Sequence, residues 1–209
     1  MTRFKRKSPI PLLKALSFVT LLVCLRLFVI EIVTVASSSM ENTLTKGDIL
    51  LVNKLHGEVK KGEITVFNIS EPSNKLVKRC VATAGDIVRI DSLQNHFQIK
   101  PNVFPKTLAE SSFEKGLITI EIPSKNRKYQ INQVFYDQFQ KTIRLYEGEI
   151  LVKRFDEYLL NGKPIQEYTF KNNYLFFVGD NMDNSFDSRH FGPIPANNIF
   201  GRAYLLFNK

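Results

Sequence analysis

Two short stretches of the 209-residue sequence carry side chains that are candidates for chemistry. In "VASSSMENTL", residues 35–44, three consecutive serines follow a long apolar run and end at Met40. A flexible linker would continue with more Gly, Ser or Pro. This stretch instead passes through "TKGD" into "ILLVNKL", which has the composition of a β-strand. The serines therefore lie at a junction between two ordered segments, and one of their hydroxyls is a candidate functional group.

The second stretch, "KLVKRCV", places Lys78 in the middle of a predicted strand. Alternation along a strand puts Leu76 and Cys80 on the same face as Lys78, and Arg79 on the opposite face. If both faces are covered, only one of the two basic side chains can be well solvated. Taken alone, the pattern favours a surface strand whose lysine reaches water. We interpret Cys80 as a small buried hydrophobic residue rather than a nucleophile.

A polar loop, "VGDNMDNSFDSRHFG", follows an apolar strand near the C-terminus. Its side chains include several carboxylates, amides and hydroxyls together with one arginine. Such a loop is often a solvated cluster of Asx-turns. The same density of donors and acceptors also suits a hydrogen-bond network that orients a functional site.

The composition argues against several classes of function. The net charge of +9 first suggests a nucleic-acid partner, but residues 1–36 carry +5 of it and the other 173 residues carry only +4. No nucleic-acid-binding signature accompanies the charge, so no nucleic-acid partner is predicted. The three histidines lack metal-ligand spacing and no phosphate-binding loop is present, so no metal or cofactor is predicted. Cys24 lies in the N-terminal apolar run and Cys80 in the globular part of the chain, so a disulfide between them is not expected.

The N-terminal region predicts a membrane anchor. A basic tail, residues 1–11, precedes an apolar stretch at 12–33 that is long enough to span a bilayer. The alternative is a cleaved signal peptide ending near Ala36, although Arg26 and Glu31 interrupt the region where such a peptide is most apolar. The positive-inside rule places the tail in the cytoplasm and the body outside.

The rest of the chain predicts a mainly β protein. Short strand-like runs alternate with Gly and Asn residues, which favour turns. The apolar residues of these runs show no sustained 3.6-residue period, and the chain has no visible internal repeat. We therefore expect an all-β domain of antiparallel sheets at 34–90 and 149–209, which contains both stretches with candidate functional side chains. The less regular residues 91–148 are interpreted as an inserted smaller subdomain.

Five ordered motifs carry a resemblance to a known family. "SSSMENTL", "GDILLVNK", "KKGEITVF", "LVKRCVATAGD" and "VGDNMDNSFDSRHFG" resemble the conserved boxes of the bacterial type I signal peptidases, serine endopeptidases with a Ser/Lys dyad. The stretch "LRLFVIEIVTVAS" is similar to the segment of that family that leaves the membrane. Because the family keeps this segment, the resemblance favours the anchor over a cleaved peptide. It covers roughly residues 21–90 and 174–205.

The resemblance implies a role for each matching residue. Ser39 corresponds to the nucleophile, Lys78 to the general base, and Ser37 with the Ser39 backbone N–H to the oxyanion hole. Residues in supporting positions are Ser185, which would orient the lysine, Asp187 and Arg189, which would form an ion pair, and Asp180. Residues expected to line the substrate pocket are Val35, Met40, Leu44, Leu76 and Val77. Alternation would point Ser38 away from the site.

The sequence departs from the family pattern without losing a catalytic group. Asn42 stands where the family usually has Pro, Met182 where Arg is frequent, and His190 and Phe191 where Tyr and Trp are common. Asn42 is expected to loosen the turn after the nucleophile. The chemistry is coherent, because a lysine acts as a base only when it is neutral, and burial in an apolar strand lowers its pKa.

We therefore expect an endopeptidase that removes signal peptides from exported preproteins. It would lie in the bacterial cytoplasmic membrane, in contact with lipid, cross it once and face outward. Cleavage is expected after small-x-small sequences such as Ala-x-Ala. Alternatives are a peptidase dedicated to one substrate, a Ser/His/Asp hydrolase that uses His190, and an inactive membrane-tethered β binding module.

Overall fold

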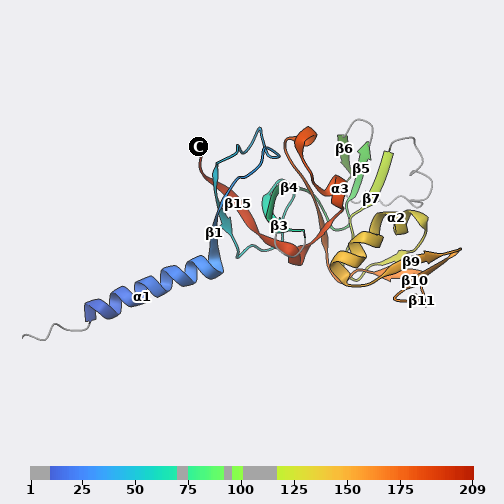
Figure 1. The fold of residues 1–209 in the computed structure, drawn as a ribbon, viewed down its shortest axis with the longest axis horizontal. Helices are drawn as coiled ribbons and strands as arrows, with labels where there is room; N and C mark the ends of the chain where they lie inside the picture. Colours follow the sequence, from blue (N-terminus) through green and yellow to red (C-terminus); the bar gives the residue numbers. More distant parts are fainter. Residues whose placement is uncertain (1–9, 70–74, 92–95, 101–116) are drawn as a thin grey trace, which may run out of the picture.

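The computed structural model describes residues 10–69, 75–91, 96–100 and 117–209. Its main feature is an antiparallel sheet of seven strands, in the spatial order β1-β2-β15-β3-β4-β13-β14 (Figure 1). The strands of this sheet are β1 (Ile30–Thr34), β2 (Ile49–Asn53), β3 (Ile64–Asn68), β4 (Lys75–Thr83), β13 (Tyr174–Val178), β14 (Ile194–Pro195) and β15 (Ile199–Phe207). The prediction of a mainly β protein with antiparallel sheets is confirmed.

Three smaller antiparallel sheets complete the body. One joins β6 (His96–Lys100), β5 (Ile87–Asp91) and β7 (Leu117–Glu121), and another pairs β8 (Lys128–Gln130) with β12 (Glu167–Thr169). The third contains β9 (Leu151–Arg154), β10 (Glu157–Leu160) and β11 (Lys163–Pro164). Figure 1 shows this last sheet at the end of the molecule opposite the N-terminal helix α1.

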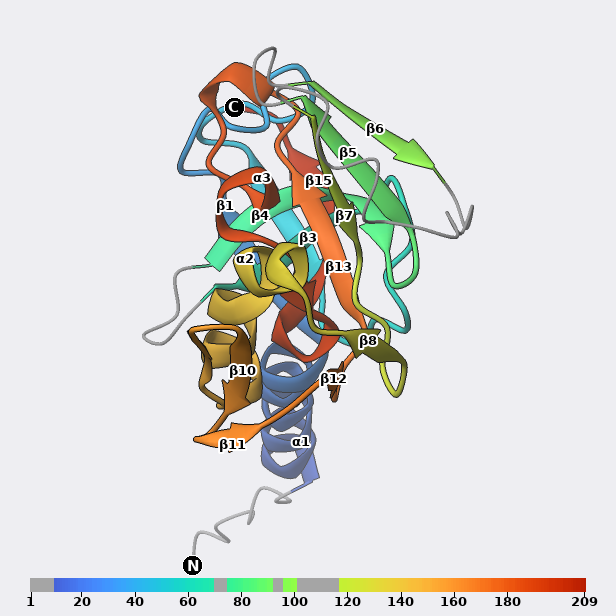
Figure 2. The same cartoon turned by 90° about the vertical axis from the view of Figure 1, so that its right-hand side faces the viewer.

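Helices occupy three places in the described chain. The helix α1 (Ile10–Cys24) runs into the π-helical turn η1 (Leu25–Val29), and α2 (Gln133–Thr142) runs into η2 (Ile143–Glu147). A short helix α3 (Ser188–Phe191) and the 3₁₀ turns η3 (Met182–Asn184) and η4 (Ala196–Asn198) lie near the C-terminus. Figure 2 shows α2 between α3 and the sheet β9–β11.

The helix α2 lies within residues 91–148, the predicted inserted subdomain, for which the sequence analysis predicted no helix. Asn132 caps its first turn by accepting a hydrogen bond from the Phe135 backbone N–H at 2.9 Å. Phe135, Phe139 and Ile143 follow at four-residue intervals and are all buried. They pack in an aromatic cluster that includes Phe170, so packing of one face holds this helix in place.

The N-terminal region of the described chain is helical only as far as Val29. Residues 30–33 of the predicted 12–33 anchor belong instead to β1, whose residue Glu31 pairs in register with Val52 of β2. None of the described helices has both the length and the apolar character that a membrane crossing requires. The anchor therefore stays a prediction, and residues 1–9 of the predicted tail lie outside the described residues.

The predicted division into domains also stays a prediction. Within the predicted insertion at 91–148, residues 92–95 and 101–116 lie outside the described residues. The parts that are described contribute β6, β7, β8 and α2. Of these, α2 packs into the aromatic cluster together with Phe176 of β13, a strand of the large sheet.

Candidate active site

The three serines lie in a tight turn between β1 and β2, at residues 37–43. We call it the nucleophile turn because it contains Ser39, the predicted nucleophile. Backbone hydrogen bonds from Glu41 N to Ser38 O (3.0 Å) and from Leu44 N to Met40 O (2.8 Å) close this turn. The side chains of Met40 and Leu44 are each only 1% exposed. Because these two apolar side chains are packed in the core, the position of Ser39 is fixed relative to the large sheet.

The strand β4 brings Lys78 to this turn. Alternate residues of β4, including Lys78 and Cys80, are buried, as the alternation in the sequence predicts. Lys78 is 3% exposed, and its Nζ is hydrogen-bonded to Ser39 Oγ. Ser37 Oγ lies 3.1 Å from Ser39 Oγ. Two hydroxyls and one amine that are far apart in sequence thus converge on one point.

The environment of Lys78 favours its neutral form. Burial lowers the pKa of the Lys78 ammonium group, because the charged form has lost its hydration. Asp187 opposes this effect and Arg189 reinforces it. Among the described residues no carboxylate forms an ion pair with Lys78, so burial has the largest effect.

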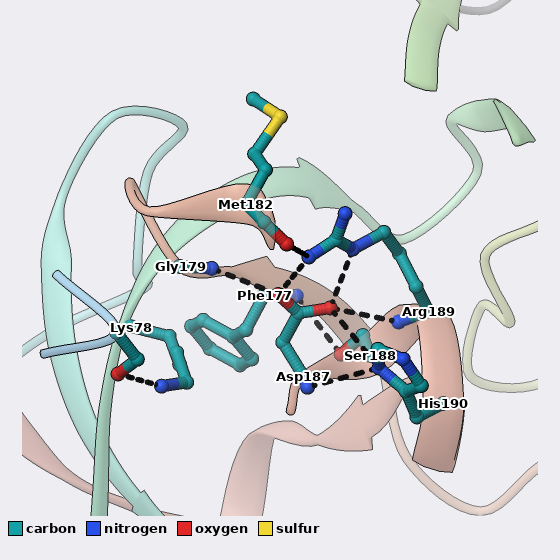
Figure 3. Close-up of polar contacts among 9 residues, drawn as sticks. Lys78, Phe177, Gly179, Met182, Asp187, Ser188, Arg189 and His190 are labelled. Carbon is teal, nitrogen blue, oxygen red and sulfur yellow. Dashed lines mark hydrogen bonds and ion pairs between the residues drawn. The ribbon is translucent and has the colours of Figure 1, made fainter. Parts of the chain in front are cut away.

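Asp187 and Arg189 form a buried bidentate ion pair in the neighbourhood of Lys78, which with Ser39 makes up the predicted dyad (Figure 3). Arg189 Nε and Nη2 donate to the two carboxylate oxygens at 2.8 and 2.9 Å, and the Gly179 N–H donates to one of them at 3.0 Å. Burial alone would raise the pKa of Asp187, but these hydrogen bonds outweigh it and hold that pKa below its usual value. The carboxylate therefore stays charged and paired, and it caps α3.

Asp180 supports the nucleophile turn rather than this pair. Arg79 donates from Nε to Asp180 Oδ1 at 2.8 Å and from Nη2 to Oδ2 at 2.5 Å. Thr43 Oγ1, in the nucleophile turn, donates to the same carboxylate at 2.5 Å. The two basic neighbours of β4 thus have different surroundings, because Arg79 is paired whereas Lys78 is enclosed.

Ser185 lies close to the dyad but without the hydrogen bond to Lys78 that the resemblance implies. Its hydroxyl is buried, and it is one of the groups that hold the pKa of the Asp187 carboxyl low. A Cβ placed on Gly179 would lie 2.2 Å from Ser185 Oγ and 2.4 Å from the Ser39 carbonyl oxygen. Only glycine at position 179 therefore allows the polar loop to approach the nucleophile turn so closely.

Two asparagine side chains of the polar loop, to which the sequence analysis gave no role, hold the nucleophile turn against this loop. Asn184 Nδ2 donates to Ser38 Oγ at 2.8 Å, and Asn181 Nδ2 donates to Ser38 O at 3.1 Å. Ser38 therefore faces the loop instead of pointing away from the site, because the serines lie in a turn to which strand alternation does not apply. The asparagines of the polar loop were visible in the sequence, but their partners lie over 140 residues away.

Asn42 has a backbone conformation that explains why it replaces the family's proline. Its φ is +83°, in the left-handed region where Asn is tolerated and where proline, fixed near −65°, cannot go. A turn with proline at this position would need another backbone conformation. Hydrogen bonds of the Thr43 and Ser38 side chains tie the turn to the polar loop, and its loosening by Asn42 stays a prediction.

A cavity of about 490 Å³ opens in front of the dyad. Its lining comes from the nucleophile turn, β4 and the polar loop, and consists of Ser37, Ser39, Leu76, Lys78, Asp183, Asn184, Ser185, Phe186 and His190. Of the five predicted pocket residues, Leu76 alone lines it. Val35, Met40 and Leu44 are buried in a core cluster against which the partly buried Val77 packs, because the nucleophile turn folds onto the large sheet.

His190 also lines this cavity but is not bonded to Ser39. Its Nδ1 accepts a hydrogen bond from the Asp187 backbone N–H at 3.4 Å and lies 3.9 Å from the Asp187 carboxylate. Lys78 is the basic side chain that contacts the Ser39 hydroxyl. Cys80 is fully buried, and burial raises the pKa of its thiol to about 12, so it is not a nucleophile.

Comparison with known proteins places this arrangement in a family. The model of the family "Signal peptidase, peptidase S26" matches residues 11–207. Signal peptidase I of Aquifex aeolicus is 29% identical over 88% of this chain and 77% of its own length. Signal peptidase I of Pseudomonas aeruginosa is 28% identical over 88% of this chain and 66% of its own length.

A third relative, Signal peptidase I of Buchnera aphidicola from Schizaphis graminum, is 26% identical over 86% of this chain and 68% of its own. The chain thus spans about two thirds to three quarters of the length of these relatives. It belongs to the S26 family of signal peptidases and is a peptidase. The resemblance seen in the sequence motifs is confirmed.

Proposed function

We propose that this peptidase removes signal peptides from exported preproteins, with Ser39 as the nucleophile and Lys78 as the general base. The observation that carries the proposal is the hydrogen bond between Lys78 Nζ and Ser39 Oγ at a buried lysine whose pKa is lowered. A serine hydroxyl is a weak nucleophile until a base accepts its proton. A lysine without an ion-pair partner can be that base near neutral pH.

In the first half of the reaction, Ser39 Oγ attacks the scissile carbonyl carbon and its proton passes to Lys78 Nζ. The oxyanion then accepts hydrogen bonds from Ser37 Oγ and from the Ser39 backbone N–H, a group that bonds to no acceptor among the described residues. The C–N bond breaks, and the Lys78 ammonium protonates the leaving amine. In the second half, Lys78 takes a proton from water, and the water oxygen attacks the acyl-enzyme carbonyl carbon. The bond from that carbon to Ser39 Oγ then breaks, Lys78 returns the proton to Ser39 Oγ, and the signal peptide leaves with a free carboxylate.

The other polar residues act by positioning. The Asp187–Arg189 pair and the Asp180–Arg79 pair fix the polar loop and the nucleophile turn relative to β4. Because Arg189 compensates the charge of Asp187, the carboxylate does not hold Lys78 in its charged form. Ser185, whose buried hydroxyl interacts with Asp187 and lines the same cavity as Lys78, is placed to bond the lysine once substrate is bound.

For substrate selection we propose cleavage after small-x-small sequences. An extended peptide bound beside the dyad points the residues one and three before the scissile bond to the same side. Leu76 lines the cavity there, and the side chains of Met40 and Leu44, close to Ser39 in the chain, are buried in a core cluster. Small side chains such as Ala are therefore accepted at both positions, whereas large or charged ones are excluded. A peptidase dedicated to one substrate remains the alternative.

The test uses the full chain in detergent with a preprotein that has an Ala-x-Ala site, and maps the cleavage site by mass spectrometry. We expect Ser39→Ala and Lys78→Ala to abolish cleavage, and His190→Ala to slow it without abolishing it. Substantial turnover by Lys78→Ala together with loss of activity in His190→Ala would instead support the Ser/His/Asp alternative. Folding of each variant is checked by its thermal unfolding.

We further propose that the N-terminal segment anchors the enzyme in the bacterial cytoplasmic membrane, with the body outside. The support is the basic start of the chain and the apolar run that follows it. A salt bridge joins Glu31 of β1 to Lys54, and Lys54 Nζ also donates to the carbonyl oxygens of Arg26 and Leu27, so the helical segment is tied to the sheet. Protease added to spheroplasts should digest the body, and protection of the body would contradict this topology.

A further inference from the structure

The cavity in front of the dyad has one aromatic wall that the proposed chemistry does not use. Phe186 belongs to its lining, yet 64% of this residue is exposed. The Phe186 ring stacks on the His190 ring, with centroids 5.1 Å apart and planes 28° apart. It also packs edge-on against Phe191, with centroids 5.6 Å apart. The ring is therefore held in place although one of its faces is open.

An exposed aromatic ring held in this way is a favourable contact surface for a ligand. Its conformational entropy is already restricted by His190 and Phe191, so less is lost when a ligand covers it. Aromatic residues bury a large apolar area and dominate many peptide and protein interfaces. The other lining side chains of this cavity are polar or, like Leu76, partly buried.

We infer that Phe186 and His190 form a specificity-determining subsite for an apolar, preferably aromatic, substrate side chain next to the scissile bond. This inference rests on the proposed function. In an extended peptide the two small residues point one way, and the side chains between them and just after the bond point the other way. Those two positions, the second before the bond and the first after it, are the ones from which a large side chain can reach the aromatic wall.

The charges around the cavity agree with an apolar occupant. Asp183 contributes an exposed carboxylate to the lining, and the proposed mechanism keeps Lys78 neutral. An acidic substrate side chain would therefore meet an apolar wall and a like charge without a compensating partner. The subsite thus discriminates against Asp and Glu and favours Phe, Tyr and Leu.

The experiment measures kcat and KM for two series of peptides with Ala fixed at the two small positions. One series carries Phe, Leu, Ser or Asp at the position between them, and the other carries the same residues just after the bond. We expect wild type to prefer Phe over Ser by about three- to tenfold in kcat/KM in one series, mainly through KM. Asp should be the poorest residue in that series.

Variants test whether the aromatic rings of Phe186 and His190 cause this preference independently of the rest of the site. Phe186→Ala should bring the Phe/Ser ratio close to one while the requirement for Ala at the small positions persists. Phe155→Ala is the matched control, because Phe155 is 97% exposed in the turn between β9 and β10 and does not line the cavity. It should keep the wild-type ratio. His190→Ala should reduce the ratio, and His190→Tyr, which restores a ring for Phe186 to stack on, should recover it.

The outcomes distinguish a failure of the proposed subsite from a failure of the proposed function. If wild type cleaves the peptides with a ratio near one in both series, or if Phe186→Ala keeps the ratio, the subsite is refuted while the Ser/Lys mechanism stands. If wild type cleaves none of these peptides or the preprotein, or if Ser39→Ala still cleaves them, the proposed function itself fails, and this inference fails with it.

Discussion

The core around α2 and the core around β4 both enclose polar groups, but these groups differ in the hydrogen-bond partners that compensate their burial. Near α2, Tyr174 donates to Glu147 and Tyr168 donates to Glu149, each at 2.7 Å, and burial raises the pKa of both phenols. On β4, Lys78 is buried almost as deeply as these two tyrosines, but its hydrogen-bond partner among the described residues is the Ser39 hydroxyl and not a charged group. The carboxylates of Glu147 and Glu149 thus each accept a hydrogen bond from a tyrosine, which compensates for the loss of water.

The difference separates polar groups that stabilise the fold from one that can exchange a proton. A buried group that is compensated keeps a single protonation state, because changing that state would break its hydrogen bonds. Lys78 has no such compensation, since Arg189 already pairs with Asp187. Its ammonium form is destabilised by burial, so the pKa of Lys78 lies below the ordinary lysine value.

The largest expected effect tests the α2 side of this comparison. Phe170 is fully buried, and its ring centroid lies 5.0 Å from that of Tyr168 and 5.2 Å from that of Tyr174. Phe170→Ala should lower the free energy of unfolding by about 3–5 kcal/mol, through lost burial and a residual cavity. Thermal unfolding in detergent measures this. The pH at which activity is half-maximal should not move, and a shift of that pH would show that the two cores are coupled.

The next effect concerns the proposed oxyanion hole beside β4. Ser37→Ala should lower kcat by about 10²–10³, since one donor to the developing negative charge is lost. KM and the thermal unfolding temperature should stay near their wild-type values, because Ser37 is exposed and its hydroxyl bonds, within the described part of the chain, to Ser39 Oγ alone. A wild-type kcat in this variant would assign Ser37 to the structure of the turn alone. Ser37→Thr, which keeps a hydroxyl, is the control.

The smallest effect concerns the turn itself. Asn42→Pro should destabilise the protein by more than about 1 kcal/mol and lower kcat, because proline cannot adopt the φ of +83°. Asn42→Gly, which tolerates a positive φ, should change both quantities little. If Asn42→Pro matched wild type in unfolding temperature and kcat, the left-handed turn would not be the conformation that positions Ser39.

Local patterns in the sequence predicted part of this architecture. The alternation around Lys78 and the apolar runs gave the strands, because strand geometry depends on neighbours two residues apart. Helix α2 was missed although Phe135, Phe139 and Ile143 have helical spacing, since aromatic and β-branched residues also favour strands. The bond from Asn184 to Ser38 and the aromatic wall of Phe186 depend on tertiary contacts, which no local pattern encodes.

The most direct test of the central claim is the pH dependence of kcat/KM between about pH 5 and 10. Below the lowered pKa of Lys78 the ammonium form predominates and cannot accept the Ser39 proton, so activity should be low there. Activity should rise as the pH passes through that pKa, which lies below the usual lysine value of about 10.4. Arg189→Lys, which weakens the compensation of Asp187, should move the rise to higher pH. A rate that does not change over this range would contradict a neutral lysine as the base.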